Sequence, residues 1–433
     1  MSEILITILS ALTEFWNILT TFLAETWWFW FLIILFPVVK TSLLYWRQLL
    51  YERDQKYVLL EMNVPREILK NPRGMEQFFS AIHTLCDGPI STMAKYWNGV
   101  TPHSFSLEIV SFGGQVHFYI RTYHKYKSII SSALLSYYPD VEIVEVEDYV
   151  NRLPTSMIEA VDKGYNIWGT EMILKKPAAY PIKTYKDFET PDEELQFDPM
   201  STFLEGLSKL EKGEIVGIQM VTVPSETKWN VKYKDLLADL RKPQSKGVGE
   251  DEGFPSIRTP GETDVLKAVE NNFSKPPFDV TIRFLYLAPQ NIFNEGVIRR
   301  AMVGAFNQYG TLHLNSFGQN FDMATMGLVW FWPHLFTKTR VKLRQQRILD
   351  FYRNRSVPVD SAMGQFLSSH FLNWNSLSKS IELNTEALAT LFHPPTKAVL
   401  TAPHIKRVES RKAGPSAGLQ IFGDDDALDK FQS

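Results

Sequence analysis

The segment at residues 27–46, WWFWFLIILFPVVKTSLLYW, constrains the fold more than any other, because it is strongly apolar and carries one charge, Lys40. A helix of about 20 apolar residues matches the roughly 30 Å hydrocarbon core of a bilayer. Aromatic residues suit both membrane interfaces, and the long stem of a lysine can carry its ammonium towards the nearer one. A buried core helix is the alternative, but it rarely places several tryptophans so close to a chain start. The sequence therefore predicts a transmembrane helix within residues 26–50, anchored in the bilayer by Trp27, Trp28, Trp30, Tyr45, Trp46 and Arg47.

The distribution of basic residues predicts the orientation of this helix. No Lys or Arg precedes Trp27, whereas Arg47, Arg53 and Lys56 follow closely after the apolar segment. Cytoplasmic flanks of a span carry an excess of Lys and Arg. We therefore expect a single-pass protein of the inner membrane, with its N-terminus outside and its bulk in the cytoplasm. The basic stretch and the cleavage site of a secretory signal peptide are both missing.

Residues 1–25 show a different pattern, in which polar residues recur at spacings of three and four, from Glu3 and Thr7 to Thr21 and Glu25. This spacing predicts an amphipathic helix with a continuous polar stripe. Such a helix lies in the membrane interface or packs against copies of itself, so we expect a homo-oligomer. A second spanning helix is the alternative, but residues 24–26 are too few for a hairpin between two spans.

Composition and motifs argue against several classes of function. The single cysteine, Cys86, excludes an intramolecular disulfide and a cysteine-based metal cage, and it suits a reducing cytoplasm. The net charge of −3 is not that of a general nucleic-acid binder. The sequence holds no GxxxxGK(S/T) and no HExxH motif, and its histidines are scattered. We therefore predict a non-enzymatic protein without a cofactor or a metal ion.

Alternating and helical periodicities after residue 50 predict two copies of one element order, β-α-β-β-α-β. The first unit covers residues 55–152, with strands at 57–64, 104–112, 115–122 and 140–149 and helices at 73–86 and 125–138. The second covers residues 160–320 with an insertion at 225–276, and it has strands at 165–175, 214–224, 278–288 and 311–317 and helices at 198–210 and 291–309. This order is that of a ferredoxin-like fold. We predict an α+β protein in which an N-terminal transmembrane helix precedes two tandem ferredoxin-like units and a helical C-terminal segment.

Residues 321–382 combine an aromatic stretch at 328–336 with a basic helix after it. Tryptophan suits the headgroup layer and cations attract anionic lipid, so the pattern favours a membrane-surface or partner contact. A core-packing segment followed by a solvated helix face is the alternative, and nucleic acid is a third, less favoured ligand. The residues expected in this contact are Trp330, Trp332, Lys338, Arg340, Arg344 and Arg347.

Three segments carry a family resemblance: residues 57–64, residues 105–149, and residues 383–394 (LNTEALATLFHP) with the tail at 413–422. Together they resemble the membrane-anchored N-terminal region of HerA- and coupling-protein-like ATPases of type IV secretion or conjugation systems. In that family, a basic connector and the nucleotide-binding core follow. The resemblance implies that residues 383–433 are a connector and tail, with Asn384, Leu388, Leu391, Phe392, His393 and Pro394 in the connector. Alone, residues 383–394 predict only a capped helix that ends at a proline.

The sequence ends at Ser433, where the ATPase core of that family would begin. The resemblance therefore implies a non-enzymatic membrane adaptor that docks a separate, cytoplasmic hexameric P-loop ATPase. The alternative is a lipid-binding or scaffold protein that acts on the membrane surface without an ATPase.

Overall fold

The computed structural model describes residues 2–395 and 407–408, apart from 66–70, 86–89, 190–196, 226–227, 243–257, 326–334, 359–363, 365–369 and 374–375. The chain divides into two compact units. The first, which we call the helical unit, comprises Met1–Gln55, Pro89–Thr101 and Val359–His370. The second, the sheet unit, comprises Lys56–Gly88, Pro102–Pro358 and Phe371–Ser433.

The helical unit is built on one uninterrupted helix, α1 (Ser2–Asp54), which runs through both of the N-terminal segments that the sequence separates. By length and composition its part from Ser10 to Asp54 could cross a membrane, and none of its most apolar window is buried against the protein. Threonine hydroxyls along α1, such as those of Thr26 and Thr41, donate to carbonyls one turn earlier. These bonds satisfy the hydroxyls within the helix, so that they need no partner from the surroundings.

The sheet unit is organised around one large sheet, whose strand order is β10-β1-β3-β2-β6-β7-β5-β8, with β4 paired to β1 and β9 paired to β7. All of these pairings are antiparallel except that of β1 with β10. The predicted mixed α+β class is confirmed. Two strands near the C-terminus are short: β9 is Ile381–Asn384 and β10 is Arg407–Val408.

Two halves of the sheet repeat the same order of elements. The first half consists of β1 (Tyr57–Pro65), α2 (Arg73–Ile82), β2 (Phe105–Phe112), β3 (Gln115–Tyr123), α3 (Lys127–Tyr137) and β4 (Glu142–Val146). The second consists of β5 (Tyr165–Leu174), α5 (Ser201–Ser208), β6 (Ile215–Pro224), β7 (Pro277–Pro289), α9 (Glu295–Ala305) and β8 (Phe317–Gln319). Their strand orders are β4-β1-β3-β2 and β8-β5-β7-β6, and the pairing of β2 with β6 joins the halves into one sheet.

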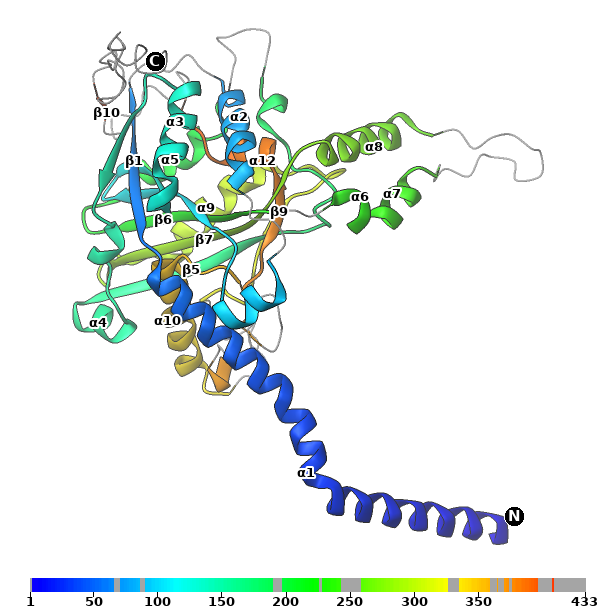
Figure 1. The fold of residues 1–433 in the computed structure, drawn as a ribbon. Coiled ribbons are helices and arrows are strands. Elements are labelled where there is room, and N and C mark those ends of the chain that lie inside the picture. The colour runs from blue at the N-terminus through cyan, green and yellow to red at the C-terminus, as the bar shows by residue number, and fades with distance from the viewer. Residues whose placement is uncertain are drawn as a thin grey trace, which may run out of the picture. The chain divides into compact units, whose positions relative to one another are not determined.

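Helices cover both faces of this sheet (Figure 1). One face packs against α2, α3, α5, α9 and α12 (Thr385–Leu391) through a large apolar core. The opposite face packs against α4 (Met157–Asp162) and α10 (Thr337–Asn354) through a smaller core. Because neighbouring residues of a strand point to opposite faces, strands buried on both sides contain nearly continuous apolar runs.

The insertion between β6 and β7 contains three helices, α6 (Trp229–Lys232), α7 (Lys234–Leu240) and α8 (Pro260–Phe273), which extend from the side of the sheet in Figure 1. The sequence predicts an insertion here but no helix at α8. The missed signal is a capping box: the Thr259 hydroxyl accepts from the Glu262 amide, and the Glu262 carboxylate accepts from the Thr259 amide. Pro260 at the first helical position completes this start signal.

Helix α10 approaches the sheet closely at Gly217 of β6. A Cβ atom at this position would overlap the hydroxyl of Tyr352 and lie 2.7 Å from its Cζ. Gly217 therefore leaves the space into which the Tyr352 side chain of α10 fits. This contact fixes the distance of α10 from the joint between the two halves.

Replacing Gly217 with alanine should destabilise the sheet unit by about 1–3 kcal/mol, because the added methyl group overpacks the contact with α10. The loss should be smaller when Tyr352→Phe removes the clashing hydroxyl. The matched control is Gly261→Ala in α8, where the added Cβ has no neighbour within 4 Å. Chemical denaturation of the three variants measures the free energy of unfolding, and an unchanged value for G217A would contradict the close approach.

Candidate functional site: a buried polar row beneath helix α10

A row of polar side chains crosses the sheet on the face that α10 covers. The strand register places Glu108 of β2 opposite Gln219 of β6, Gln219 opposite Arg283 of β7, and Arg283 opposite Glu171 of β5. These four residues, which we call the polar row, are fully buried. Burying a charge is strongly unfavourable unless it is paired and hydrogen-bonded, so the partners of each one decide whether the arrangement is stable.

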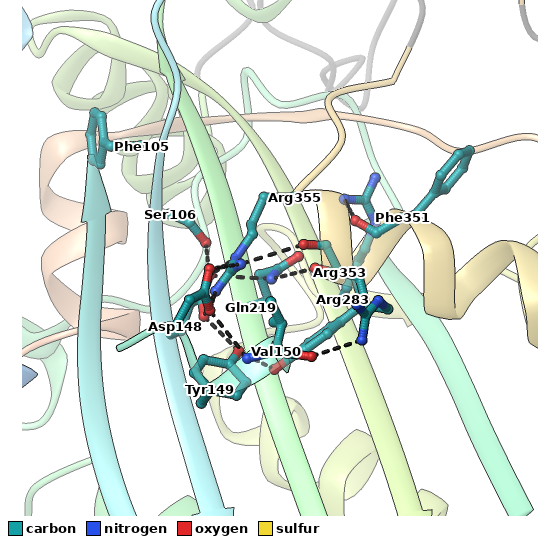
Figure 2. A network of polar contacts seen from close by, with 12 residues as sticks. Phe105, Ser106, Asp148, Tyr149, Val150, Gln219, Arg283, Phe351, Arg353 and Arg355 are labelled. Atoms are coloured by element: carbon teal, nitrogen blue, oxygen red, sulfur yellow. Dashed lines mark hydrogen bonds and ion pairs between the residues drawn. The ribbon is translucent and has the colours of Figure 1, made fainter. Parts of the chain in front are cut away.

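Glu108 and Arg355 form a buried, two-point ion pair. Figure 2 shows Arg355 together with Asp148, Tyr149 and Gln219 of the same network. Arg355 Nε lies 2.9 Å from Glu108 Oε1, and Nη2 lies 3.2 Å from Oε2. The same guanidinium donates to both carboxylate oxygens of Asp148, at 2.6 and 2.9 Å. A planar guanidinium binds a carboxylate with two parallel bonds, and here it binds two carboxylates at once.

Three neutral side chains complete the hydrogen bonding of Glu108. The Ser106 hydroxyl donates to Oε1 at 2.6 Å, the Tyr149 hydroxyl to Oε2 at 2.5 Å, and the Gln219 amide to Oε1 at 3.2 Å. Burial by itself raises the pKa of Glu108, but the Arg355 guanidinium and the Ser106 and Tyr149 hydroxyls outweigh it, and the pKa lies below its ordinary value. Burial, together with the Glu108 carboxylate, raises the pKa of Tyr149 well above its ordinary value, so the phenol stays a donor.

A second buried ion pair occupies the other end of the row. Arg283 Nε lies 2.9 Å from Glu171 Oε1, which also accepts from the Ser378 hydroxyl at 2.6 Å. The other oxygen of Glu171 accepts from the Asn320 amide at 3.3 Å. The pair therefore connects β5 and β7 to the segments that precede α10 and β9.

The polar row also contacts the C-terminus of α10, where the Tyr352 and Phe351 carbonyls already accept from the backbone amides of Arg355 and Ser356. Gln219 donates to the Tyr352 carbonyl at 3.1 Å, and Arg283 donates to the Phe351 carbonyl at 3.4 Å. Arg355 follows the helix with the left-handed φ of 50° at its cap. Two buried cations thus lie at the negative end of the helix dipole, which is a favourable position.

Arg353 fastens the same turn of α10 to the 3-10 turn after β4. Its Nη1 donates to the carbonyls of Val150 and Leu153, both at 2.7 Å, and to that of Pro154 at 3.2 Å. The last turn of α10 is therefore bonded both to the sheet and to the 3-10 turn after β4. The ion pair of Glu108 and Arg355, together with Asp148, fixes the end of α10, and we call these three residues the clasp. The charged groups of the polar row are buried away from solvent.

Perturbed pKa values cluster at active sites, but structural ion-pair networks perturb them as well. No group of three or more His, Cys, Asp or Glu side chains that could hold a metal ion occurs among the residues that the structure describes. The hydrogen bonds and ion pairs of the polar row connect it to the last turn of α10.

The residues predicted for a membrane-surface contact lie in different environments. Trp330 and Trp332 lie outside the described residues. Lys338 is exposed, and Arg347 is half-buried with its guanidinium 5.0 Å from the ring centroid of Phe351. Arg340 and Arg344 are only 1% and 0% exposed.

The burial of Arg340 and Arg344 corrects their predicted role at a lipid or partner surface. Arg340 donates to the Asn373 side chain at 3.3 Å, and Arg344 donates to the Asp322 carbonyl at 2.6 Å. These cations bind the chain that surrounds α10, because internal acceptors are available to them there. A basic helix in the sequence does not reveal which of its cations have such acceptors.

The six residues predicted for a connector are buried in the sheet unit: Asn384, Leu388, Leu391, Phe392, His393 and Pro394. Asn384 ends β9, which pairs with β7, and its side chain caps α12 by accepting from the Ala387 amide at 2.8 Å. His393 Nε2 lies 3.1 Å from Asp198 Oδ1. The alternative interpretation of a capped helix is confirmed, and residues 384–394 are part of the core.

The six residues predicted to anchor the membrane helix lie on α1. Trp27, Trp28, Trp30, Tyr45 and Trp46 have exposed side chains. The Arg47 guanidinium lies 5.3 Å from the ring centroid of Trp46.

The sequence analysis did not single out the polar row, although a signal for it exists. Glu108 and Glu171 are the single charged residues of β2 and β5, and Arg283 lies within a long apolar run of β7, as in FSLEIVSF and VTIRFLYLA. A charge in this position indicates either a solvated face or a buried pair. Only the register brings the partners together.

The polar row lies within the part of the chain that matches a known protein family. A family described as "Domain of unknown function (DUF8128)" matches residues 50–407. This range includes every residue of the polar row and begins near the end of α1. No curated protein matches the chain.

Replacing Arg355 with methionine should destabilise the sheet unit by about 3–5 kcal/mol, because it leaves the Glu108 carboxylate buried without its cation. Adding Glu108→Gln removes that buried charge and should restore most of the loss. The matched control is Lys209→Met, which breaks the exposed pair with Glu205 and should cost less than about 1 kcal/mol.

Denaturant unfolding of these variants measures the coupling between positions 108 and 355. If the losses from Arg355→Met and Glu108→Gln simply add in the double variant, the clasp is not a coupled pair.

Proposed function

Because the chain belongs to the DUF8128 family of domains of unknown function, we propose a function on the basis of its own fold and sequence. It is a membrane-anchored, non-enzymatic adaptor that holds a cytoplasmic P-loop ATPase of a type IV secretion or conjugation-like system at the inner membrane. The observation that carries the anchoring is the exposed apolar surface of α1.

The side chains of α1 support a bilayer as its surroundings. Trp27, Phe31 and Phe36 are more than half exposed, within a helix long enough to span. Contiguous apolar surface of this extent marks a membrane or protein contact, since each Å² of apolar area removed from water contributes about 25 cal/mol. The basic residues Arg53 and Lys56 after the helix favour a cytoplasmic position for the sheet unit.

The two halves of the sheet are two ferredoxin-like units, one within residues 55–152 and one within residues 160–320. Their shared order of elements and of strands supports this assignment. Joined through β2 and β6, the halves present one continuous sheet with helices on both faces. Such a platform suits a protein that positions a partner.

A structural role for the polar row supports an adaptor over an enzyme. The two buried ion pairs are used to fix α10, so the surfaces around that helix are held in one arrangement. The family resemblance implies that the partner is an ATPase. The segments that carry this resemblance, in β1, β2–β4 and β9–α12, belong to the sheet unit. Residues 396–433, which follow the core segment of α12, are the part that would contact the motor.

A lipid-binding scaffold that acts without an ATPase is the second candidate. Leu335 and Phe336 are exposed beside Lys338 at the start of α10, which favours a surface contact there. The burial of Arg340 and Arg344 removes two of the cations on which that candidate depends.

Deleting residues 396–433 should weaken the capture of a P-loop ATPase by the chain reconstituted in nanodiscs. We expect mass spectrometry of proteins bound from the native host lysate to show a Walker-motif ATPase, depleted roughly tenfold by the deletion, which corresponds to about 1.4 kcal/mol of binding free energy. The matched control replaces residues 243–257, in the insertion, by a flexible linker of equal length. Equal partner sets for the full and the shortened chain would contradict the adaptor and leave the scaffold candidate.

A further inference from the structure

The segment Pro89–Thr101 belongs to the helical unit, although the sequence places it between α2 and β2 of the sheet unit. Its centre is a short π-helix, η2 (Ala94–Asn98). π-Helical turns are rare in proteins, and many of those that occur lie at functional sites.

Ring contacts hold η2 against α1. Lys40 Nζ lies 5.0 Å from the ring centroid of Tyr96. The Arg47 guanidinium lies 5.5 Å from the ring centroid of Trp97 and 5.3 Å from that of Trp46, so it lies between two tryptophans. Each of these cation–π contacts is stronger where water is partly excluded.

Gly99 ends η2 at a point where the two backbones nearly touch. Its φ is +69°, and a Cβ there would overlap the backbone carbonyl of Arg47. The position therefore requires glycine for its conformation and for its space. This close approach fixes the level of η2 along α1 between Lys40 and Arg47.

Two large apolar side chains in or next to η2 are exposed. Trp97 is 65% exposed and Met93 73%, and Trp46 on the adjoining part of α1 is 52% exposed. Tryptophan and tyrosine with a neighbouring lysine or arginine are the chemistry of the membrane–water interface, where a ring meets the acyl boundary and a cation meets phosphate.

We propose that Pro89–Thr101 is a second membrane contact, which lies in the lipid headgroup layer and sets the depth of α1. The proposal rests on the proposed function in that α1 spans the bilayer. The occupant of this surface is lipid because the surface continues the apolar surface of α1 and carries cations that complement anionic headgroups.

A consequence for the span follows from the polar groups of η2. The segment carries the polar side chains Lys95 and Asn98, and irregular backbone does not lie exposed in hydrocarbon. Because η2 lies beside α1 between Lys40 and Arg47, the hydrocarbon boundary falls within this stretch, and Tyr45 and Trp46 lie at the interface.

The test measures the depth of single nitroxide labels on the full chain in vesicles that contain anionic lipid. Cys86→Ser removes the native cysteine, and labels are then placed at Trp97→Cys, at Met93→Cys as a second site, and at Phe31→Cys within the span. Val231→Cys, on an exposed position of α6, is the aqueous control. Electron paramagnetic resonance reports the accessibility of each label to oxygen, which is enriched in lipid, and to a water-soluble nickel chelate.

We expect the labels at positions 97 and 93 to be several-fold less accessible to the nickel chelate than the label at 231, and to gain access to oxygen. Aqueous values at 97 and 93 with a lipid value at 31 would overturn this inference and leave the proposed anchoring intact. Protection from both reagents would show a protein occupant and overturn the assignment to lipid. An aqueous value at 31 would overturn the proposed function and this inference with it.

Discussion

The buried ion pair between Glu108 and Arg355 is the interaction on which the sheet unit depends. It joins β2, at the joint of the two halves, to the residue that ends α10, across a sequence separation of 247 residues. Taking two ions out of water costs several kcal/mol for each, and only good geometry with further hydrogen bonds offsets that loss. The Ser106 and Tyr149 hydroxyls and the Gln219 amide donate to Glu108. The Asp148 carboxylate accepts two further bonds from Arg355. The clasp is therefore stable as a complete set, and removing one charged partner leaves the other buried and unpaired.

The repeated order of the two halves explains where this set of charges lies. The pairing of β2 with β6 places these two strands in the middle of the sheet. Glu108 and Gln219 occupy that centre, and Arg283 and Glu171 extend the row towards β5. The small cross-section of Gly217 admits the Tyr352 side chain next to them. Apolar packing and charge pairing thus act on the same turn of α10.

Much of the fold could be predicted from the sequence, because alternation and helical periodicity report burial directly. The strands β1, β2, β3, β5, β6 and β7 begin and end close to the predicted bounds. The polar row could not be predicted, since a single glutamate in a strand is equally compatible with a solvated face. The same ambiguity misplaced Arg340 and Arg344, whose acceptors are contributed by segments distant in sequence. The resemblance predicts a connector at residues 384–394, whereas this segment contains α12, and its apolar side chains are part of the core.

The two units use cations and aromatic rings in opposite ways. In the helical unit, Arg47 lies between Trp46 and Trp97, both of which are exposed. In the sheet unit, Arg283 is fully buried, with its guanidinium 5.2 Å from the ring centroid of Phe351. The first arrangement suits a boundary between lipid and water, and the second suits a rigid interior. An anchor attached to a rigid platform is the combination that the proposed adaptor requires.

The pH dependence of the unfolding free energy tests most directly whether the clasp is a charged pair. The pKa of Glu108 lies below its ordinary value of 4.5 in the folded protein. Its contribution to stability is therefore complete above pH 4.5 and is lost as the pH falls through the folded pKa. We predict that the stability difference between the wild-type protein and Glu108→Gln is largest near neutral pH and shrinks at acid pH below 4.5. Two parallel profiles, with a difference that does not change with pH, would contradict the charged clasp.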